Sequence, residues 1–227
     1  MGDTERIKSF QLFEMTPSVT ASPRHSVLKV GLEFENQALS EGYQFIAGVD
    51  EVGRGCLAGC VVAAAVILDF SKPVPDGLND SKKLSAKKRE SLDSQIKDNA
   101  VSYAIAEVSA DEIDKINILE ATKKAMSLAI KKLDPAADFL LIDAVQLKTL
   151  FIPQKAIIHG DAISASIAAA SIIAKNYRDN LMQEIDQIYP EYGFAKHVGY
   201  GTKAHFEAIR THGPCEIHRK SFRGVLS

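Results

Sequence analysis

The stretch from Phe45 to Leu68, FIAGVDEVGRGCLAGCVVAAAVIL, constrains the fold more than any other part of this 227-residue chain. Two apolar runs rich in β-branched residues lie on either side of an acidic pair, Asp50 and Glu51, and of several glycines. Such runs favour buried strands, and glycines supply the bend between them. Neighbouring carboxylates beside a core are costly to desolvate unless a cation or strong donors compensate them. The stretch therefore predicts two strands joined by a turn that carries a metal site.

The composition is that of one globular domain with a short appendage. Hydrophobic residues make up 46% and charged residues 25% of the chain, a balance typical of a folded protein with its own core. Three cysteines cannot all pair, and their spacing matches no disulfide framework, which favours a reducing cytoplasm. The N-terminus lacks the apolar segment of a signal peptide, and no apolar run reaches the ~18 residues of a membrane span. We therefore expect a cytoplasmic protein without a membrane segment.

The formal net charge of −2 hides an uneven distribution. Residues 196–227 hold six Lys or Arg against two Glu, a local net charge of +4. Basic residues gathered in one segment are typical of nucleic-acid contact. We therefore expect a basic substrate-binding segment over residues 190–227.

Sequence patterns predict a mixed α/β order along the chain. Residues 1–40 form an N-terminal extension of uncertain order and role, with a short helix from about residue 30 to Gly42. The first three strands are expected to form an antiparallel meander, and helices between the later strands imply parallel neighbours. Strands are expected over residues 45–52, 60–68, 101–108, 139–143 and 155–158. Helices are expected over 85–99, 111–133 in two pieces, 163–189 and 202–212, with a glycine-rich loop at 193–205.

Four acids stand at the ends of apolar elements: Asp50, Glu51, Asp143 and Asp161. In a regular strand Asp50 and Glu51 point to opposite faces, so joint ligation requires the strand to end or bulge there. Four carboxylates balance two divalent cations, and ligands that are all oxygen suit Mg²⁺ or Mn²⁺. A pair of such ions hydrolyses phosphodiesters. Any one of these acids has an ordinary alternative as a helix cap or a solvated strand end, so the prediction depends on the whole set.

Five motifs in fixed order resemble bacterial ribonuclease HII. They are GVDEVGRG at 48–55, NDSKKLS at 79–85, LLIDA at 140–144, HGDAISASIAAASIIAKNYRD at 159–179 and YGFAKHVGYGTKAH at 192–205. The resemblance implies a ribonuclease H-like three-layer α/β fold over residues 41–227. It implies a mixed five-stranded sheet, three antiparallel strands followed by parallel ones, with helices on both faces. The implied activity is endonucleolytic hydrolysis of RNA in RNA/DNA duplexes and at single ribonucleotides embedded in DNA, leaving 5′-phosphate and 3′-hydroxyl ends.

The resemblance also assigns roles to individual residues. It implies that the four acids named above are the metal ligands and that Gly53, Arg54 and Gly55 read the ribose 2′-hydroxyl through their backbone. Glycines let a main chain approach a sugar closely, and the 2′-hydroxyl distinguishes RNA from DNA. The remaining implied contacts are Tyr200 against the neighbouring sugar and Ser81 and Lys82 on phosphates.

Two positions depart from the family pattern. Cys56 stands where the family usually has proline, and Ala144 where it usually has glycine. The metal ligands are untouched by either departure. We expect the protein to be a monomer whose partners are RNA/DNA hybrids and DNA that contains ribonucleotides.

Three other readings of the sequence are open. A metal-independent ribonuclease could use His159, His197 or His218 as acid and base, with attack by the substrate's own 2′-hydroxyl. A non-catalytic binder could grip phosphates through residues 196–223, in which case affinity falls steeply with salt. A zinc site is a weaker alternative, because its spacing is unusual; its ligands would come from Cys56, Cys60, His212, Cys215 and His218.

Overall fold

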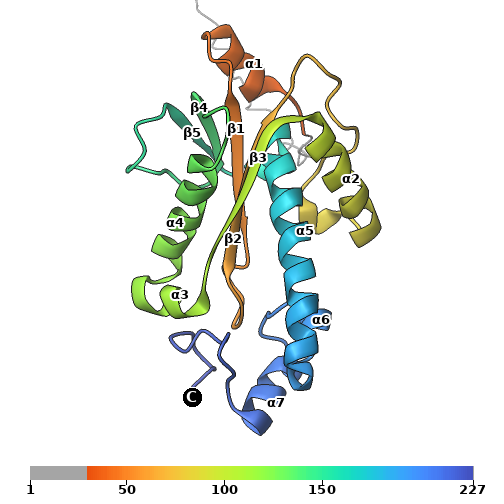
Figure 1. Cartoon of the computed structure of the whole chain (residues 1–227), viewed down its shortest axis with the longest axis vertical. Helices are drawn as coiled ribbons and strands as arrows, with labels where there is room; N and C mark the ends of the chain where they lie inside the picture. Colours follow the sequence, from red (N-terminus) through yellow and green to blue (C-terminus); the bar gives the residue numbers. More distant parts are fainter. Residues whose placement is uncertain (1–29, 227) are drawn as a thin grey trace, which may run out of the picture.

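A mixed five-stranded sheet forms the centre of the protein, which the computed structural model describes over residues 30–226 (Figure 1). The strand order is β3-β2-β1-β4-β5; β1, β2 and β3 are antiparallel neighbours, whereas β4 lies parallel to β1 and to β5. This topology confirms the predicted meander followed by parallel strands. The bounds are β1 (Ile46–Val52), β2 (Val61–Leu68), β3 (Ala100–Val108), β4 (Phe139–Asp143) and β5 (Gln154–Ile157).

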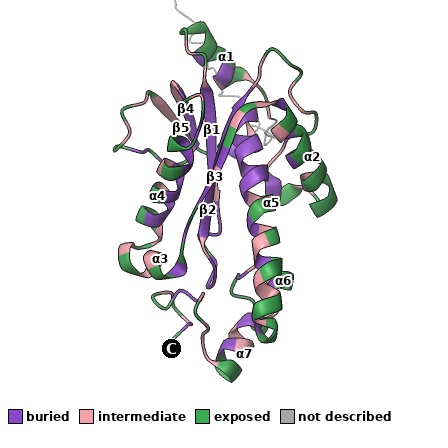
Figure 2. Ribbon diagram, viewed as in Figure 1, coloured by how far each residue is buried: buried purple, intermediate pink, exposed green. Residues whose placement is uncertain are grey.

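Helices cover both faces of the sheet (Figure 1). One apolar core joins the sheet to α4 (Ile118–Lys131), and a second joins it to α2 (Ala86–Asn99) and α5 (Ala165–Ile188). Between them β1 and β2 are almost entirely buried, whereas the edge strands β3 and β5 are partly exposed (Figure 2). The other helices are α1 (Glu33–Ser40), α3 (Ala110–Ile116), α6 (Phe194–His197) and α7 (Lys203–His212). Single 3₁₀ turns are η1 (Ser81–Lys83), η2 (Gly160–Ala162) and η3 (Pro190–Tyr192).

The predicted helices and strands are confirmed, with one difference at the C-terminal end. The loop expected over residues 193–205 contains the short helix α6. Left-handed backbone at Gly193 and Val198 bounds this single turn, which is too short to produce a recognisable apolar period. None of the helices within residues 30–226 combines the length and apolarity needed to cross a membrane.

Helix α5 lies unusually close to β1 because both elements have small residues where they meet. The alanines of its first half are fully or almost fully buried against the sheet, as the run of Ala and Ser predicts. On the strand, Gly48 faces the backbone of Ser166: a Cβ at Gly48 would lie 2.0 Å from the Ser166 carbonyl carbon. The backbones of β1 and α5 are therefore in direct contact at Gly48, two residues before the acidic pair Asp50 and Glu51.

Residues 30–40 of the predicted extension pack onto the start of α5. The Glu35 side chain is fully buried, and its Oε1 accepts hydrogen bonds from Ser164 Oγ (2.6 Å) and Ser166 N (2.9 Å). Gly31 adds a backbone bridge to Ser164. A carboxylate at a helix N-terminus is favourable because it meets free N–H groups and the positive end of the dipole. Helix α1 therefore fixes the segment that carries Asp161, while residues 1–29 of the extension lie outside the described residues.

A third apolar core, distinct from the two that flank the sheet, involves the C-terminal residues and is called the C-terminal cluster here. Two fully buried imidazoles, His205 and His218, lie beside it. The Cys215 N–H donates to His218 Nδ1 (2.9 Å), so His218 Nε2 carries the proton and donates to His205 Nε2 (3.0 Å). His205 Nδ1 then donates to the Tyr200 carbonyl (2.9 Å). This chain of bonds requires both rings to be neutral. The cluster comprises Leu57, Ala58, Met182, Tyr192, Phe194, Ile209 and Val225.

Acidification is expected to destabilise the C-terminal cluster. Burial, with the neighbouring His205, lowers the pKa of His218 from 6.5 to about 4. The unfolded chain therefore takes up a proton first, and stability is lost as the pH falls from about 6.5 towards 4, by about 3 kcal/mol in total. Buried carboxylates whose pKa values are raised, such as Asp50, stabilise the folded protein as the pH falls. The contribution of His218 is therefore measured by comparing variants at each pH. The free energy of unfolding in urea, measured from pH 7.5 to 4, should depend less on pH in His218→Gln than in the unchanged chain. In the control variant His212→Gln, at an exposed position, its pH dependence should equal that of the unchanged chain.

Candidate active site

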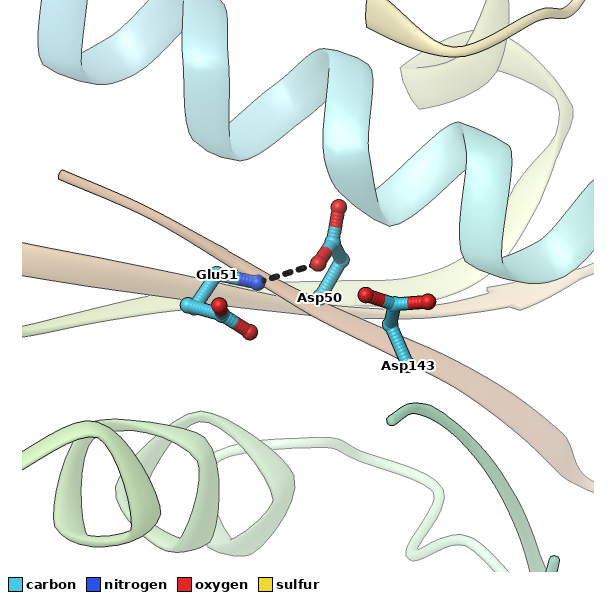
Figure 3. A group of neighbouring side chains, drawn as sticks. All are labelled: Asp50, Glu51 and Asp143. Atoms are coloured by element: carbon cyan, nitrogen blue, oxygen red, sulfur yellow. Dashed lines mark hydrogen bonds between the residues drawn. The ribbon is translucent and has the colours of Figure 1, made fainter. Parts of the chain in front are cut away.

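Three carboxylates converge where β1 passes the end of β4 (Figure 3). One oxygen each from Asp50, Glu51 and Asp143 lies within 4.8 Å of the others. Strand β1 pairs with β4 only as far as Val49, opposite Ile142, but with β2 as far as Val52. The last residues of β1 therefore have one open edge, and Asp143, the last residue of β4, lies beside it.

The expected strand end or bulge between Asp50 and Glu51 is wrong. Both residues pair regularly with β2, opposite Ala64 and Ala63. Their side chains leave opposite faces of the sheet, Asp50 towards α5 (Figure 3). They reach a common site because β4 has already ended there, so both carboxylates can bend around the open edge.

The three carboxylates are poorly compensated by the protein. Burial, reinforced by the charges of Glu51 and Asp143, raises the pKa of Asp50 well above its usual range. Burial also raises the pKa of Glu51 against the opposing effect of Arg54, whose Nη1 lies 3.3 Å from Glu51 Oε1. Glu51 Oε2 is buried and has no hydrogen-bond partner among residues 30–226. A divalent cation would remove all of these costs, and oxygen-only ligands fit Mg²⁺ or Mn²⁺.

Asp161 lies next to this group but is not part of it. It shares a cavity of about 320 Å³ with Asp143, and burial together with the charges of Asp80 and Asp143 raises its pKa. Lys82 Nζ lies 3.8 Å from Asp161 Oδ2, so this carboxylate already has a cation near it. The structure thus brings together three of the four predicted ligands, with the fourth across one shared cavity.

A second cavity, of about 300 Å³, opens on the other side of Lys82. Its lining includes the predicted contacts Ser81, Lys82 and Tyr200 together with Glu51. Burial opposes the shift, but the charges of Asp80, Asp161 and Asp50 raise the pKa of Lys82, which is fully protonated at neutral pH. Sequence reasoning did not single out three further polar residues of this lining: Arg89, Ser171 and Lys175.

A signal for two of the missed residues was present in the sequence. Ser171 and Lys175 are four apart on α5, so they occupy one face of the helix. Ser171 Oγ lies 2.9 Å from Ser81 Oγ, and Lys175 Nζ lies 2.6 Å from Asp179 Oδ1. Arg89, from α2, reaches Asp179 Oδ2 at 3.0 Å. The pairing of Arg89 with α5 depends on tertiary packing and could not be read from spacing.

The Gly53–Gly55 turn lies between the two carboxylates of β1 and the C-terminal cluster. Gly53 has φ +92°, and a Cβ there would lie 2.3 Å from Arg178 Nε, so only glycine fits. Gly55 is open: the nearest atom to a Cβ at this position is Tyr200 Cε1, at 4.0 Å. The turn and Tyr200 therefore lie side by side, as their predicted common role in sugar contact requires.

The histidine and zinc alternatives receive little support. His197 and His218 belong to the C-terminal region and line neither cavity, and only His159 lies beside Asp143 and Asp161. Within residues 30–226, the three carboxylates are the one group of His, Cys, Asp or Glu with metal-ligand spacing, so the five predicted zinc ligands do not assemble. A larger cavity of about 660 Å³, between α4 and the loop after β4, contains none of the predicted site residues.

Ala144 occupies a backbone conformation that favours glycine. It follows Asp143 directly, has φ +49°, and donates its N–H to the Ile157 carbonyl (3.0 Å). Left-handed backbone costs a residue with a Cβ roughly 1–2 kcal/mol. Glycine avoids this cost but loses more conformational entropy on folding, which offsets part of the gain. Ala144→Gly is therefore expected to raise the free energy of unfolding by about 0.5–1 kcal/mol in denaturant titrations. Ala156→Gly, in β5, is the control and should lower it.

Comparison with known proteins agrees with this geometry. A family model described as Ribonuclease HII matches residues 47–225. Ribonuclease HII of Desulfitobacterium hafniense is 57% identical over 194 residues, which cover 86% of this chain and 74% of that protein. The crystal structure of ribonuclease H2 from Pyrococcus horikoshii OT3 has a TM-score of 0.69 at 27% identity, over 81% of this chain and 96% of that chain. The Bst ribonuclease HIII in complex with Mn²⁺ shares the fold, with a TM-score of 0.62 at 19% identity over 83% of this chain and 70% of its own. The chain therefore belongs to the ribonuclease HII family, and it is a nuclease of the ribonuclease H class.

Proposed function

We propose that this chain hydrolyses RNA in RNA/DNA duplexes and cuts on the 5′ side of single ribonucleotides embedded in DNA, leaving 3′-hydroxyl and 5′-phosphate ends. The observation that carries the proposal is the convergence of Asp50, Glu51 and Asp143 within 4.8 Å at the open edge of β1. Three carboxylates that repel one another serve a polyanionic substrate only when cations lie between them. Asp161 completes the proposed ligand set from the adjoining cavity.

Mg²⁺ or Mn²⁺ is the proposed cofactor. Divalent ions at such a site activate water and stabilise the departing oxygen of a phosphodiester. The Mn²⁺ complex of the Bst ribonuclease HIII, which has the same fold, supports this choice. In the apo protein the pKa values of Asp50 and Glu51 are raised by burial, so metal binding is expected to release protons and to strengthen as the pH rises.

The residues around the carboxylates have proposed roles in substrate binding. Lys82, Arg89 and Lys175 line the second cavity. Arg89 and Lys175 share one partner, Asp179, so this wall keeps a net positive charge suited to phosphates. Ser81 adds a hydroxyl next to them. The backbone of Gly53, Arg54 and Gly55, with Tyr200 alongside, is proposed to contact the ribose. Ser171 supports Ser81 from α5.

The domain organisation is proposed to follow the same division. Residues 41–227 form the catalytic domain, with residues 190–227 as its substrate-binding segment, and residues 1–40 form an extension whose last part fixes α5. Of the basic residues in the C-terminal segment, Lys196, Lys203, Lys220 and Arg223 are exposed and available to phosphates. That the chain acts as a cytoplasmic monomer stays a prediction.

The decisive experiment is cleavage of a DNA duplex that contains one ribonucleotide. With Mg²⁺ or Mn²⁺ we expect a single nick on the 5′ side of the ribonucleotide, no cleavage of the all-DNA duplex, and complete loss of cleavage in EDTA. An RNA/DNA hybrid should be cut at several positions. Cleavage that survives EDTA and leaves a cyclic phosphate would support histidine chemistry instead. Tight binding without cleavage in saturating Mn²⁺ would support a non-catalytic binder.

A further inference from the structure

Arg219 is a fully buried cation in a segment whose charge otherwise faces solvent. Arg219 is one of the six basic residues within 196–227, yet its side chain has no exposed surface. Its guanidinium donates three hydrogen bonds, all to backbone carbonyls of the loop between β1 and β2. Nη2 reaches Gly53 O at 2.7 Å, Nη1 reaches Arg54 O at 2.9 Å, and Nε reaches Gly59 O at 3.0 Å. Arg219 therefore cannot contact a phosphate, and its partners include the turn proposed to read the ribose.

The bonds from Arg219 fix the direction of two peptide planes. In a trans peptide the C=O and the N–H point in opposite directions. Because Arg219 holds the Gly53 and Arg54 carbonyls, the N–H groups of Arg54 and Gly55 point away from the protein interior. Neither N–H donates to an acceptor within the part of the chain that is described. Both are therefore free for a ligand on the side where Gly55 faces Tyr200.

The Arg219 side chain is itself held rigidly. Its own N–H donates to Leu57 O (2.8 Å), its guanidinium lies 5.1 Å from the Phe222 ring centroid, and the adjacent His218 bridges to Ala58. A planar guanidinium presents several donors in a fixed fork, which a lysine ammonium on a flexible stem cannot reproduce. Removing the fork would leave buried carbonyls without partners. The C-terminal segment therefore sets the conformation of a turn some 160 residues earlier in the chain.

We propose that Arg219 is a positioning residue for ribose specificity: by binding the Gly53 and Arg54 carbonyls, it aims the amides of the turn at the 2′-hydroxyl of the substrate. The inference rests on the proposed function and deepens it. Arg219 touches neither the metal site nor the nucleic acid. Arg219 increases the preference of the protein for a ribonucleotide over a deoxyribonucleotide. The affinity of the protein for duplex DNA does not depend on Arg219.

Steady-state competition tests this role. Cleavage of a duplex with one ribonucleotide in Mg²⁺ gives its KM, and the all-DNA duplex of the same sequence, added as an inhibitor, gives a Ki. In the unchanged chain KM should lie about tenfold or more below Ki, as expected from one or two hydrogen bonds to the sugar. In Arg219→Lys the two constants should become equal within about twofold, with Ki unchanged. Arg219→Met, which keeps the volume and removes every donor, should do the same.

The neighbouring surface cation provides the control. Lys220 is exposed, so Lys220→Gln should weaken both duplexes equally and reduce the salt dependence while keeping the ratio of Ki to KM. If Arg219→Lys lowers only kcat or thermal stability and keeps that ratio, Arg219 is merely structural and the inference is overturned. If the unchanged chain shows no preference for the ribonucleotide, the proposed function fails instead.

A second measurement does not depend on how well the Arg219 variants fold. In Asp143→Asn, which we expect to bind substrate without turnover, the Arg54 and Gly55 amides should exchange hydrogen more slowly with the ribonucleotide duplex than with the all-DNA duplex. Equal exchange of these two amides in both complexes would overturn the inference.

Discussion

Asp50→Asn is expected to lower the rate of cleavage at a ribonucleotide by at least about a thousandfold and to stabilise the metal-free protein. Both effects have one cause. Asp50 is buried, its pKa is raised by burial and by Glu51 and Asp143, and all three carboxylates crowd one site. An amide removes one negative charge from a site where three carboxylates meet and where the protein itself supplies only partial compensation, from Arg54 to Glu51. Activity should therefore fall while the thermal midpoint in EDTA rises.

The pH dependence of this variant follows from the direction of the shift. A folded-state pKa above the unfolded value means that the folded protein holds the proton more tightly, so stability is lost as the pH rises through the folded pKa. The stabilising effect of Asp50→Asn should therefore be larger at pH 8 than at pH 5. Asp69→Asn is the matched control, since Asp69 follows β2, is partly exposed and has a lowered pKa through bonds from Ser71 and Lys72. It should leave cleavage unchanged. Full activity in Asp50→Asn would remove this carboxylate from the proposed metal site.

Gly48→Ala is expected to destabilise the fold by more than about 4 kcal/mol or to prevent folding. A Cβ at Gly48 would lie 2.0 Å from the carbonyl carbon and 2.1 Å from the carbonyl oxygen of Ser166. Both atoms belong to the backbone of α5, so no side-chain rotation can relieve the overlap. The helix would have to move away from β1, which would also move the buried bonds between Glu35 and the start of α5.

The measurement is urea unfolding followed by circular dichroism, with soluble yield as a second readout. Gly31→Ala is the control, because a Cβ there meets no atom of the described part of the chain within 4 Å, and its free energy of unfolding should change by less than about 0.5 kcal/mol. A folded Gly48→Ala protein with an unchanged midpoint would mean that α5 does not approach β1 as closely as the structure has it.

Local pattern was enough to predict most of the fold. Strand β2 is a continuous apolar run rich in β-branched residues, and the first half of α5 is rich in Ala and Ser, so residues 61–68 and 165–188 could be assigned from composition and propensity alone. Ser85 could be recognised as a helix cap because capping depends on one side chain and its nearest backbone, here the Lys88 N–H. The short helix α6 was missed because a single turn bounded by left-handed residues has no period to detect.

The sequence by itself determined the candidate site as a list: acids next to apolar runs, glycines in a turn, and a tyrosine far along the chain. Only the tertiary structure decided how these residues meet. Asp50 and Glu51 share a site without a bulge because β4 stops short of them, which depends on the register between strands. Arg219 is buried and binds the Gly53 carbonyl, whereas its neighbour Lys220 is exposed, although both residues carry the same charge. Spacing along a chain fixes which face of an element a side chain leaves, whereas the partner it meets depends on how the elements pack.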